Sequence, residues 1–108
     1  MTDKLVIVVR SDLRPGQQAS QIAHTMTEFM IQHPKMAHQW YAQSNTLVLL
    51  AAENEHELQC ILDRAFDLGV CTAMFREPDF GNSITGIALQ PNSKNHRICK
   101  GLSMALGG

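Results

Sequence analysis

The chain has 108 residues, of which 44% are hydrophobic and 18% charged, and its formal net charge is −1. These values are typical of one globular domain, so we treat residues 1–108 as a single domain and exclude a disordered or fibrous chain. No apolar run approaches the roughly 18 residues that a membrane span needs, and residues 1–4 lack the zones of a signal peptide. We therefore expect a cytoplasmic protein with no membrane partner.

The charges are unevenly distributed along the chain. Residues 53–79 carry seven acidic and two basic side chains, whereas the rest of the chain carries three acidic and seven basic ones. The net charge provides no overall basic field for nucleic acid, but the terminal segments could form a mildly basic face. The three cysteines form no Cys-x-x-Cys pair and the five histidines show no metal-ligand spacing, so we expect no metal site.

The first half of the chain predicts a strand and then a helix. Residues 4–10 (Lys-Leu-Val-Ile-Val-Val-Arg) are continuously apolar between two charged ends, which is typical of a strand covered on both faces. Pro15 and Gly16 mark a turn, after which residues 16–32 predict a helix that ends at His33-Pro34. Residues 35–43 are either the end of this helix or a short second one. The expected core stripe of the helix comprises Ala19, Ile22, Ala23, Met26, Phe29 and Met30.

The second half predicts three strands and two helices. Residues 46–51 form a second buried strand, and a helix then begins at an N-cap, Asn54, with Glu57 completing a capping box. This helix runs to about residue 68, with Gly69 as its C-cap, and strands follow at 70–75 and 84–89. A last helix, capped by Asn92 or Ser93, is expected to reach residue 106. The expected core stripe of the middle helix comprises Leu58, Ile61, Leu62, Ala65 and Phe66.

This order, β-α-β-α-β-β-α, predicts an α/β fold. The first two connections are long enough for parallel crossovers through helices, whereas the short 75–84 connection indicates an antiparallel fourth strand. We therefore expect a three-layer α/β/α domain with a four-stranded mixed sheet.

Ligands of open α/β sheets collect beyond the carboxyl ends of the parallel strands. Three segments with polar residues are expected to converge there, at 10–17, 51–53 and 76–79. The start of the first helix adds unpaired N–H groups, which form a weak anion site. Purely structural interpretations stay open, because Arg10 and Asp12 could simply pair and Glu77 and Asp79 could simply be turn acids.

Two segments of the sequence resemble the archaeal/eukaryotic-type peptidyl-tRNA hydrolase family. The stretch from Val8 to His24 is similar to its opening signature, a strand ending in Arg-x-Asp-Leu, a Gly/Lys-rich turn and a helix reading Ala-Ala-Gln-x-x-His. Gln21 and His24 match the glutamine and histidine at the same spacing. Residues 77–91 resemble the family's acidic loop, threonine and final strand.

The resemblance implies the same fold and the hydrolysis of the ester that joins a peptide to the ribose of tRNA, with no metal or cofactor. Peptidyl-tRNA would be the partner. The implied catalytic group is Glu77 or Asp79, which would orient water, with Thr85 and Gln17 hydrogen-bonding the substrate. The implied substrate-binding residues are Arg10, Asp12, Arg14, Gln21 and His24, and the basic residues Lys94, Arg97 and Lys100 would contact tRNA phosphates.

The sequence departs from the family pattern at two places. Gln17 stands where the family has a lysine, and Arg14 is the cation near enough in sequence to replace its charge in part. The acidic loop is shorter, so that Glu77 stands for the family's aspartate and Thr85 for its later threonine, while the earlier threonine has no counterpart. Losing a charge that stabilises a transition state costs about 3–4 kcal/mol, so catalysis does not follow from the fold.

Three functions therefore stay open: the esterase itself, a non-catalytic relative that binds an RNA end or a protein partner at the same surface, and a hydrolase or binder of another small acyl or nucleotide-like ligand. Met36, Trp40 and Tyr41 could pack internally or form the patch of a homodimer.

Overall fold

The computed structural model describes residues 3–107 and contains one five-stranded mixed sheet in the order β3-β4-β1-β2-β5. β1 is parallel to β2 and antiparallel to β4, while β3 and β5 run antiparallel to β4 and β2. No helix among residues 3–107 is long and apolar enough to cross a membrane. The strands are β1 (Lys4–Arg10), β2 (Thr46–Ala52), β3 (Thr72–Glu77), β4 (Ser83–Leu89) and β5 (Ser103–Met104).

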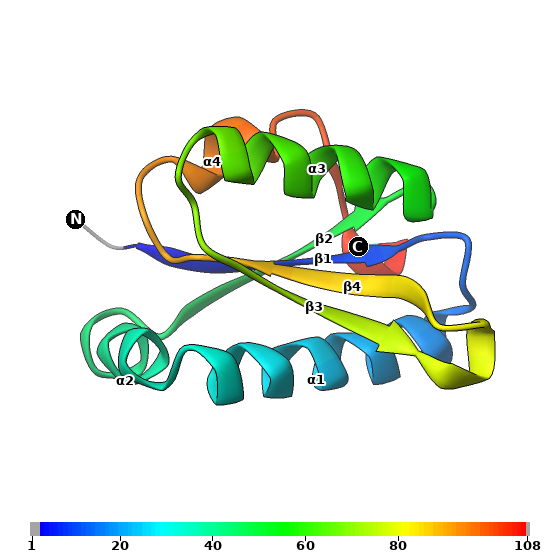
Figure 1. Cartoon of the computed structure of the whole chain (residues 1–108), viewed down its shortest axis with the longest axis horizontal. Helices are drawn as coiled ribbons and strands as arrows, with labels where there is room; N and C mark the ends of the chain where they lie inside the picture. The colour runs from blue at the N-terminus through cyan, green and yellow to red at the C-terminus, as the bar shows by residue number, and fades with distance from the viewer. Residues whose placement is uncertain (1–2, 108) are drawn as a thin grey trace.

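Helices cover both faces of this sheet (Figure 1). The first face carries α1 (Pro15–Gln32) and α2 (Pro34–Gln43), and the second carries α3 (Glu55–Asp67) and α4 (Asn95–Ile98). Side chains of β1 alternate between the two cores, with Leu5 and Ile7 packed on the α1 side and Val6 and Val8 on the α3 side. The five residues from Leu5 to Val9 are at most 4% exposed, which confirms the predicted doubly covered strand.

Several predicted boundaries are confirmed. Residues 34–43 form the separate helix α2, one of the two interpretations that the sequence left open, and α1 ends at Gln32 before the predicted His33-Pro34 break. The Asn54 side chain accepts a hydrogen bond from the Glu57 backbone N–H at 3.0 Å, as expected of an N-cap. Gly69, with φ +69°, follows the end of α3 in the left-handed conformation that favours glycine.

The prediction for the C-terminal segment is wrong. Only Asn95–Ile98 is α-helical, and the chain then forms β5 and a 3-10 turn, η2 (Ala105–Gly107), where we expected a helix to residue 106. Asn92 does accept hydrogen bonds from the backbone N–H groups of residues 94 and 95, as expected of the predicted cap. The helix nevertheless stops, because Gly101 has φ +89° and turns the chain toward the edge of β2. The sheet therefore has five strands and not four.

The predicted core stripe of α1 is confirmed only in part, since Phe29 is the one fully buried member of its six. Ala19, Ala23 and Met30 are exposed, while Ile22 and Met26 are half-buried. Burying polar groups costs little where each one has a hydrogen-bonding partner, and hydrophobic periodicity cannot detect such pairs. The buried residues of α1 are Gln18, Gln21, Thr25 and Phe29.

Two further burial predictions fail for a shared reason, which is incomplete coverage at the edges of the sheet. Phe66 is 85% exposed on α3, which packs mainly over β4, β1 and β2. In β2 only Ala51 and Ala52 are buried, because β5 pairs with Leu50 and Ala51 alone. Leu47, farther from β5, is 40% exposed.

A bulge in β4 decides which residues face α1. Phe75 pairs with Gly86 and Arg76 pairs with Ile84, so Thr85 is an extra residue opposite β3. As a result Thr85 and Gly86 both face α1. In a regular strand successive residues face opposite sides, so only one of the two would face α1. A Cβ atom on Gly86 would overlap the hydroxyl of Thr25, which donates a hydrogen bond to the Gln21 carbonyl at 2.7 Å.

Gly86→Ala should lower the free energy of unfolding by about 1–3 kcal/mol, because the fully buried Thr25 cannot move aside without losing its hydrogen bond. Gly16→Ala is the matched control, since a Cβ there meets nothing within 4 Å. Urea unfolding of both variants measures the difference. Equal stabilities of the two alanine variants would show that α1 does not approach β4 this closely.

Candidate functional site

Three side chains from three elements form a hydrogen-bonded chain between α1 and the sheet. The Thr85 hydroxyl of β4 donates to Gln21 Oε1 at 2.6 Å, and Gln21 Nε2 of α1 donates to Glu77 Oε1 of β3 at 2.9 Å. Thr85 is fully buried, Gln21 is 3% exposed and Glu77 is half-buried. This series of hydrogen bonds therefore leads from the core to the rim of the molecule and ends at a carboxylate.

The direction of each hydrogen bond in this chain is fixed by chemistry. An ionised carboxylate only accepts, so Gln21 has to present its NH₂ group to Glu77 and its oxygen to Thr85. The second Glu77 oxygen has a long contact of 3.4 Å with the Asp79 backbone N–H, which leaves it capacity to accept a further hydrogen bond. One oxygen of Glu77 is thus fixed by Gln21, and the other is able to accept a further hydrogen bond.

The loop that follows Glu77 is tightly closed. Its 3-10 turn, η1 (Pro78–Phe80), begins at the residue after Glu77, and the Asn82 N–H donates to the Glu77 carbonyl at 2.9 Å. Gly81 and Asn82 have φ +65° and +64°, the conformation that these two residue types adopt most readily. The shortened acidic loop is therefore compact, and the Asp79 side chain is exposed on it.

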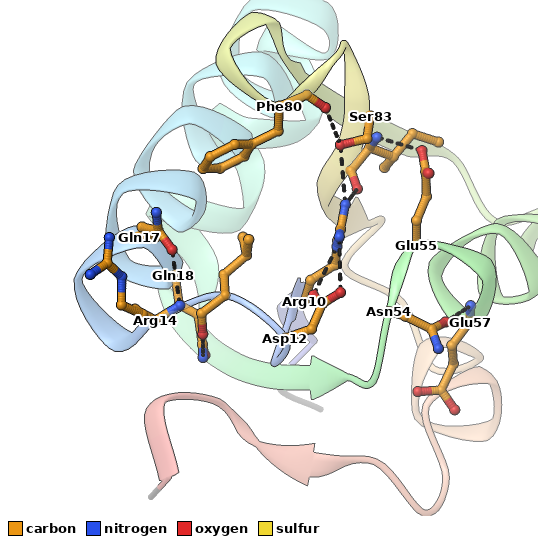
Figure 2. Close-up of polar contacts among 12 residues, drawn as sticks. Arg10, Asp12, Arg14, Gln17, Gln18, Asn54, Glu55, Glu57, Phe80 and Ser83 are labelled. Atoms are coloured by element: carbon orange, nitrogen blue, oxygen red, sulfur yellow. Dashed lines mark hydrogen bonds and ion pairs between the residues drawn. The ribbon is translucent and has the colours of Figure 1, made fainter.

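A second polar cluster surrounds Arg10 at the end of β1 (Figure 2). Arg10 binds both carboxylate oxygens of Asp12 at 2.9 Å, and its Nη1 donates to Ser83 Oγ at 3.1 Å and to the Ile84 carbonyl at 3.3 Å. These four bonds use most of the five N–H donors of a guanidinium. The bond between the two side chains raises the pKa of Arg10 and lowers the pKa of Asp12.

Glu55, the first residue of α3, completes this cluster from the other side. Its Oε2 accepts from the Ile84 N–H at 2.8 Å, so the peptide groups at Ile84 are held by Arg10 and Glu55 together (Figure 2). Thr85 follows directly after Ile84, so Arg10 and Glu55 hold the backbone of β4 where the bulge begins. Sequence reasoning missed Glu55, which lies directly after the N-cap Asn54.

The remaining predicted residues near the start of α1 have other partners. Gln17 Oε1 accepts from the Arg14 backbone N–H at 3.0 Å, and Figure 2 shows both residues apart from the Arg10 cluster. Gln18, which sequence reasoning missed, donates to the Leu13 carbonyl at 2.7 Å and accepts from the Leu106 N–H at 3.3 Å. Gln18 thus connects the 11–14 turn to the C-terminal segment.

His24 lies one helical turn beyond Gln21 and packs on β3. Its ring stacks on Phe75, with centroids 4.5 Å apart and an angle of 7° between the planes. His24 is exposed and Phe75 is half-buried.

The predicted residues thus form two clusters on opposite faces of the sheet. Gln21, Glu77 and Thr85 are joined on the α1 side, and Arg10 and Asp12 are joined on the α3 side. Lys94, one of the basic residues expected to contact tRNA, lies at neither place, since its Nζ contacts the Leu68 carbonyl at the far end of α3. Asn95 of the same segment binds the Lys4 carbonyl, about 20 Å along β1 from Arg10.

A cavity of about 620 Å³ lies at the opposite end of the sheet from both clusters. None of the predicted site residues lines it, and its walls include Asp3, His33, Trp40 and Pro91.

Comparisons with known proteins identify the family of this chain. The model of the family "Peptidyl-tRNA hydrolase PTH2" matches residues 3–104. The chain belongs to this family. A peptidyl-tRNA hydrolase of Thermococcus onnurineus (strain NA1) is 32% identical over 80 residues, which are 68% of each chain. A solved structure of a protein of unknown function from Agrobacterium tumefaciens strain C58 shares the fold of this peptidyl-tRNA hydrolase family member, with a TM-score of 0.71, 17% identity and coverage of 96% and 98% of the two chains.

The Arg10–Asp12 ion pair should make stability depend on pH. Because the pKa of Asp12 is lowered in the folded state, the pair stabilises the fold above the ordinary aspartate pKa of 3.8, and this contribution is lost as the pH falls through the folded-state pKa. Since Asp12 is 39% exposed, the effect at neutral pH is at most about 1 kcal/mol. Urea unfolding should therefore show Asp12→Asn less stable than wild type at pH 7 and equal to it near pH 2.

Asp63→Asn serves as the control, because the Asp63 carboxylate contacts only the neutral Gln59 side chain among residues 3–107. A gap between wild type and Asp12→Asn that persists unchanged at low pH would contradict the ion pair.

Proposed function

We propose that this protein hydrolyses the ester between the peptide and the tRNA of peptidyl-tRNA. The Thr85–Gln21–Glu77 chain carries this proposal, because it holds a carboxylate at the rim of the fold in a member of the peptidyl-tRNA hydrolase family. The family match does not favour the alternative of a non-catalytic relative. Peptidyl-tRNA as substrate would place the protein in the cytoplasm.

Glu77 is the group that we assign to the reacting water. Ester hydrolysis needs a water molecule that is oriented toward the carbonyl carbon and a group that accepts its proton. One Glu77 oxygen is fixed by Gln21, and the other keeps capacity for the water. Asp79 is the weaker candidate, because its side chain is exposed and makes no hydrogen bond within residues 3–107.

Thr85 acts through Gln21 in this proposal and does not touch the substrate. Its hydroxyl is fully buried and its proton is directed at Gln21 Oε1. Without that donor the amide could rotate and present oxygen to the carboxylate, which would repel it. Thr85 and Gln21 are therefore positioning residues for Glu77.

The cation that contacts the RNA is assigned to Arg14 and not to Arg10. Arg10 already makes four hydrogen bonds inside the protein, so at most one donor is left for a phosphate. Arg14 is exposed at the start of α1, where the helix dipole also favours an anion. Beside it, Gln17 keeps its oxygen on the backbone, which leaves its NH₂ group to donate toward the substrate.

A homodimer stays a prediction. Of the three residues considered for it, Trp40 is buried with its indole N–H on the Thr46 carbonyl at 2.8 Å, Met36 is half-buried, and Tyr41 is 64% exposed.

Glu77→Gln should lower kcat for peptide release from purified peptidyl-tRNA by about a hundred-fold or more, because an amide cannot accept the proton of water. The free energy of unfolding should change by less than about 1 kcal/mol, since glutamine can still accept the Gln21 hydrogen bond. Asp79→Asn is the matched comparison, a neutralised carboxylate two residues away, and should keep activity within a few-fold of wild type.

The reverse ranking of these two variants would move the assignment to Asp79. No peptide release by the wild-type protein would reject the esterase, and salt-sensitive tRNA binding without turnover would then favour a binding module.

A further inference from the structure

The His24–Phe75 stack forms a flat, rigid surface on the outside of the protein. The two rings are nearly parallel, 7° apart, at a centroid distance of 4.5 Å. Phe75 covers one face of the imidazole and His24 as a whole is exposed, from which we infer that the other face is open to solvent. The ring makes no hydrogen bond within residues 3–107, so no polar partner accounts for its orientation.

This surface adjoins the Gln21–Glu77 pair on both elements. Gln21 and His24 are three residues apart on α1, which places them on one face of the helix with Cβ atoms about 5–6 Å apart. Phe75 and Glu77 are two residues apart on β3 and face the same side of the strand. The hydrogen bond and the stack are therefore successive contacts along one α1–β3 seam.

We propose that the open face of His24 binds the terminal base of an RNA 3′ end by stacking. This inference rests on the proposed function, because it takes the ester to lie at Glu77. That ester is attached to the ribose of the last nucleotide, so its base lies one sugar away, a span comparable to one helical turn of about 5.4 Å. The three-residue step from Gln21 to His24 rises about 4.5 Å along α1, which is close to that distance.

The His24–Phe75 stack has a surface of the kind on which a base can stack. Unpaired bases at RNA ends are recognised mainly by stacking on flat side chains, including histidine. Phe75 already holds the imidazole in place, so less side-chain freedom is lost when the base binds. Every base has a flat face, so binding at the subsite should depend on the presence of a base and only little on its identity.

The test uses deacylated tRNA and the same tRNA with an abasic 3′-terminal nucleotide, with binding measured by fluorescence anisotropy at one salt concentration. His24→Ala should weaken binding of intact tRNA about ten-fold, and His24→Phe should restore it. Removal of the base should cost wild type about the same factor and cost His24→Ala almost nothing, since the two changes remove one contact. His38→Ala, which alters an exposed histidine on α2, should bind as wild type does.

Equal binding of intact and abasic tRNA by the wild-type protein would overturn the proposal, as would a His24→Phe variant as weak as His24→Ala. Peptide release separates this inference from the proposed function. Turnover by wild type with a base-independent KM would reject the base subsite alone, whereas base-dependent binding without turnover would reject the esterase alone. A KM raised in His24→Ala, with base-independent tRNA binding by wild type, would place the peptide on the ring and so reject the subsite.

Discussion

The extra residue in β4 is the constraint on which the candidate site depends. Because Thr85 has no partner on β3, it and Gly86 both face α1, and each meets a different group there. Thr85 donates to Gln21, and Gly86 leaves room for the hydroxyl of Thr25. In a regular strand one of these contacts would be lost, so the close approach of α1 and the orientation of Gln21 have a common origin.

The same stretch of β4 also joins the two polar clusters. Arg10 and Glu55 hold the backbone at Ile84 on the α3 side, and Thr85 begins the hydrogen-bonded chain on the α1 side. The charged residues that the sequence indicated at the end of β1 therefore use most of their hydrogen-bonding capacity within the protein. In the proposed function their effect on a substrate would act through the positions of Thr85 and Glu77, while Arg14 is exposed at the rim.

Local signals in the sequence predicted those features that depend on local chemistry. The buried β1, the break at Pro34, the Asn54 cap and the antiparallel β4 each follow from one residue type or one short run. The polar face of α1 was not predictable in this way, because Gln18 and Gln21 are buried against partners far along the chain. The short β5 was missed for a related reason, since a two-residue strand is defined by the edge it pairs with and has no periodicity of its own.

The buried face of α1 consists of two amides, a hydroxyl and a phenyl ring, from Gln18 to Phe29. None of these groups gains or loses a proton between mild acid and mild base. Packing of these four side chains against the sheet therefore exchanges no protons with solvent. The contact of these four side chains with the sheet is therefore polar without depending on any charge of their own.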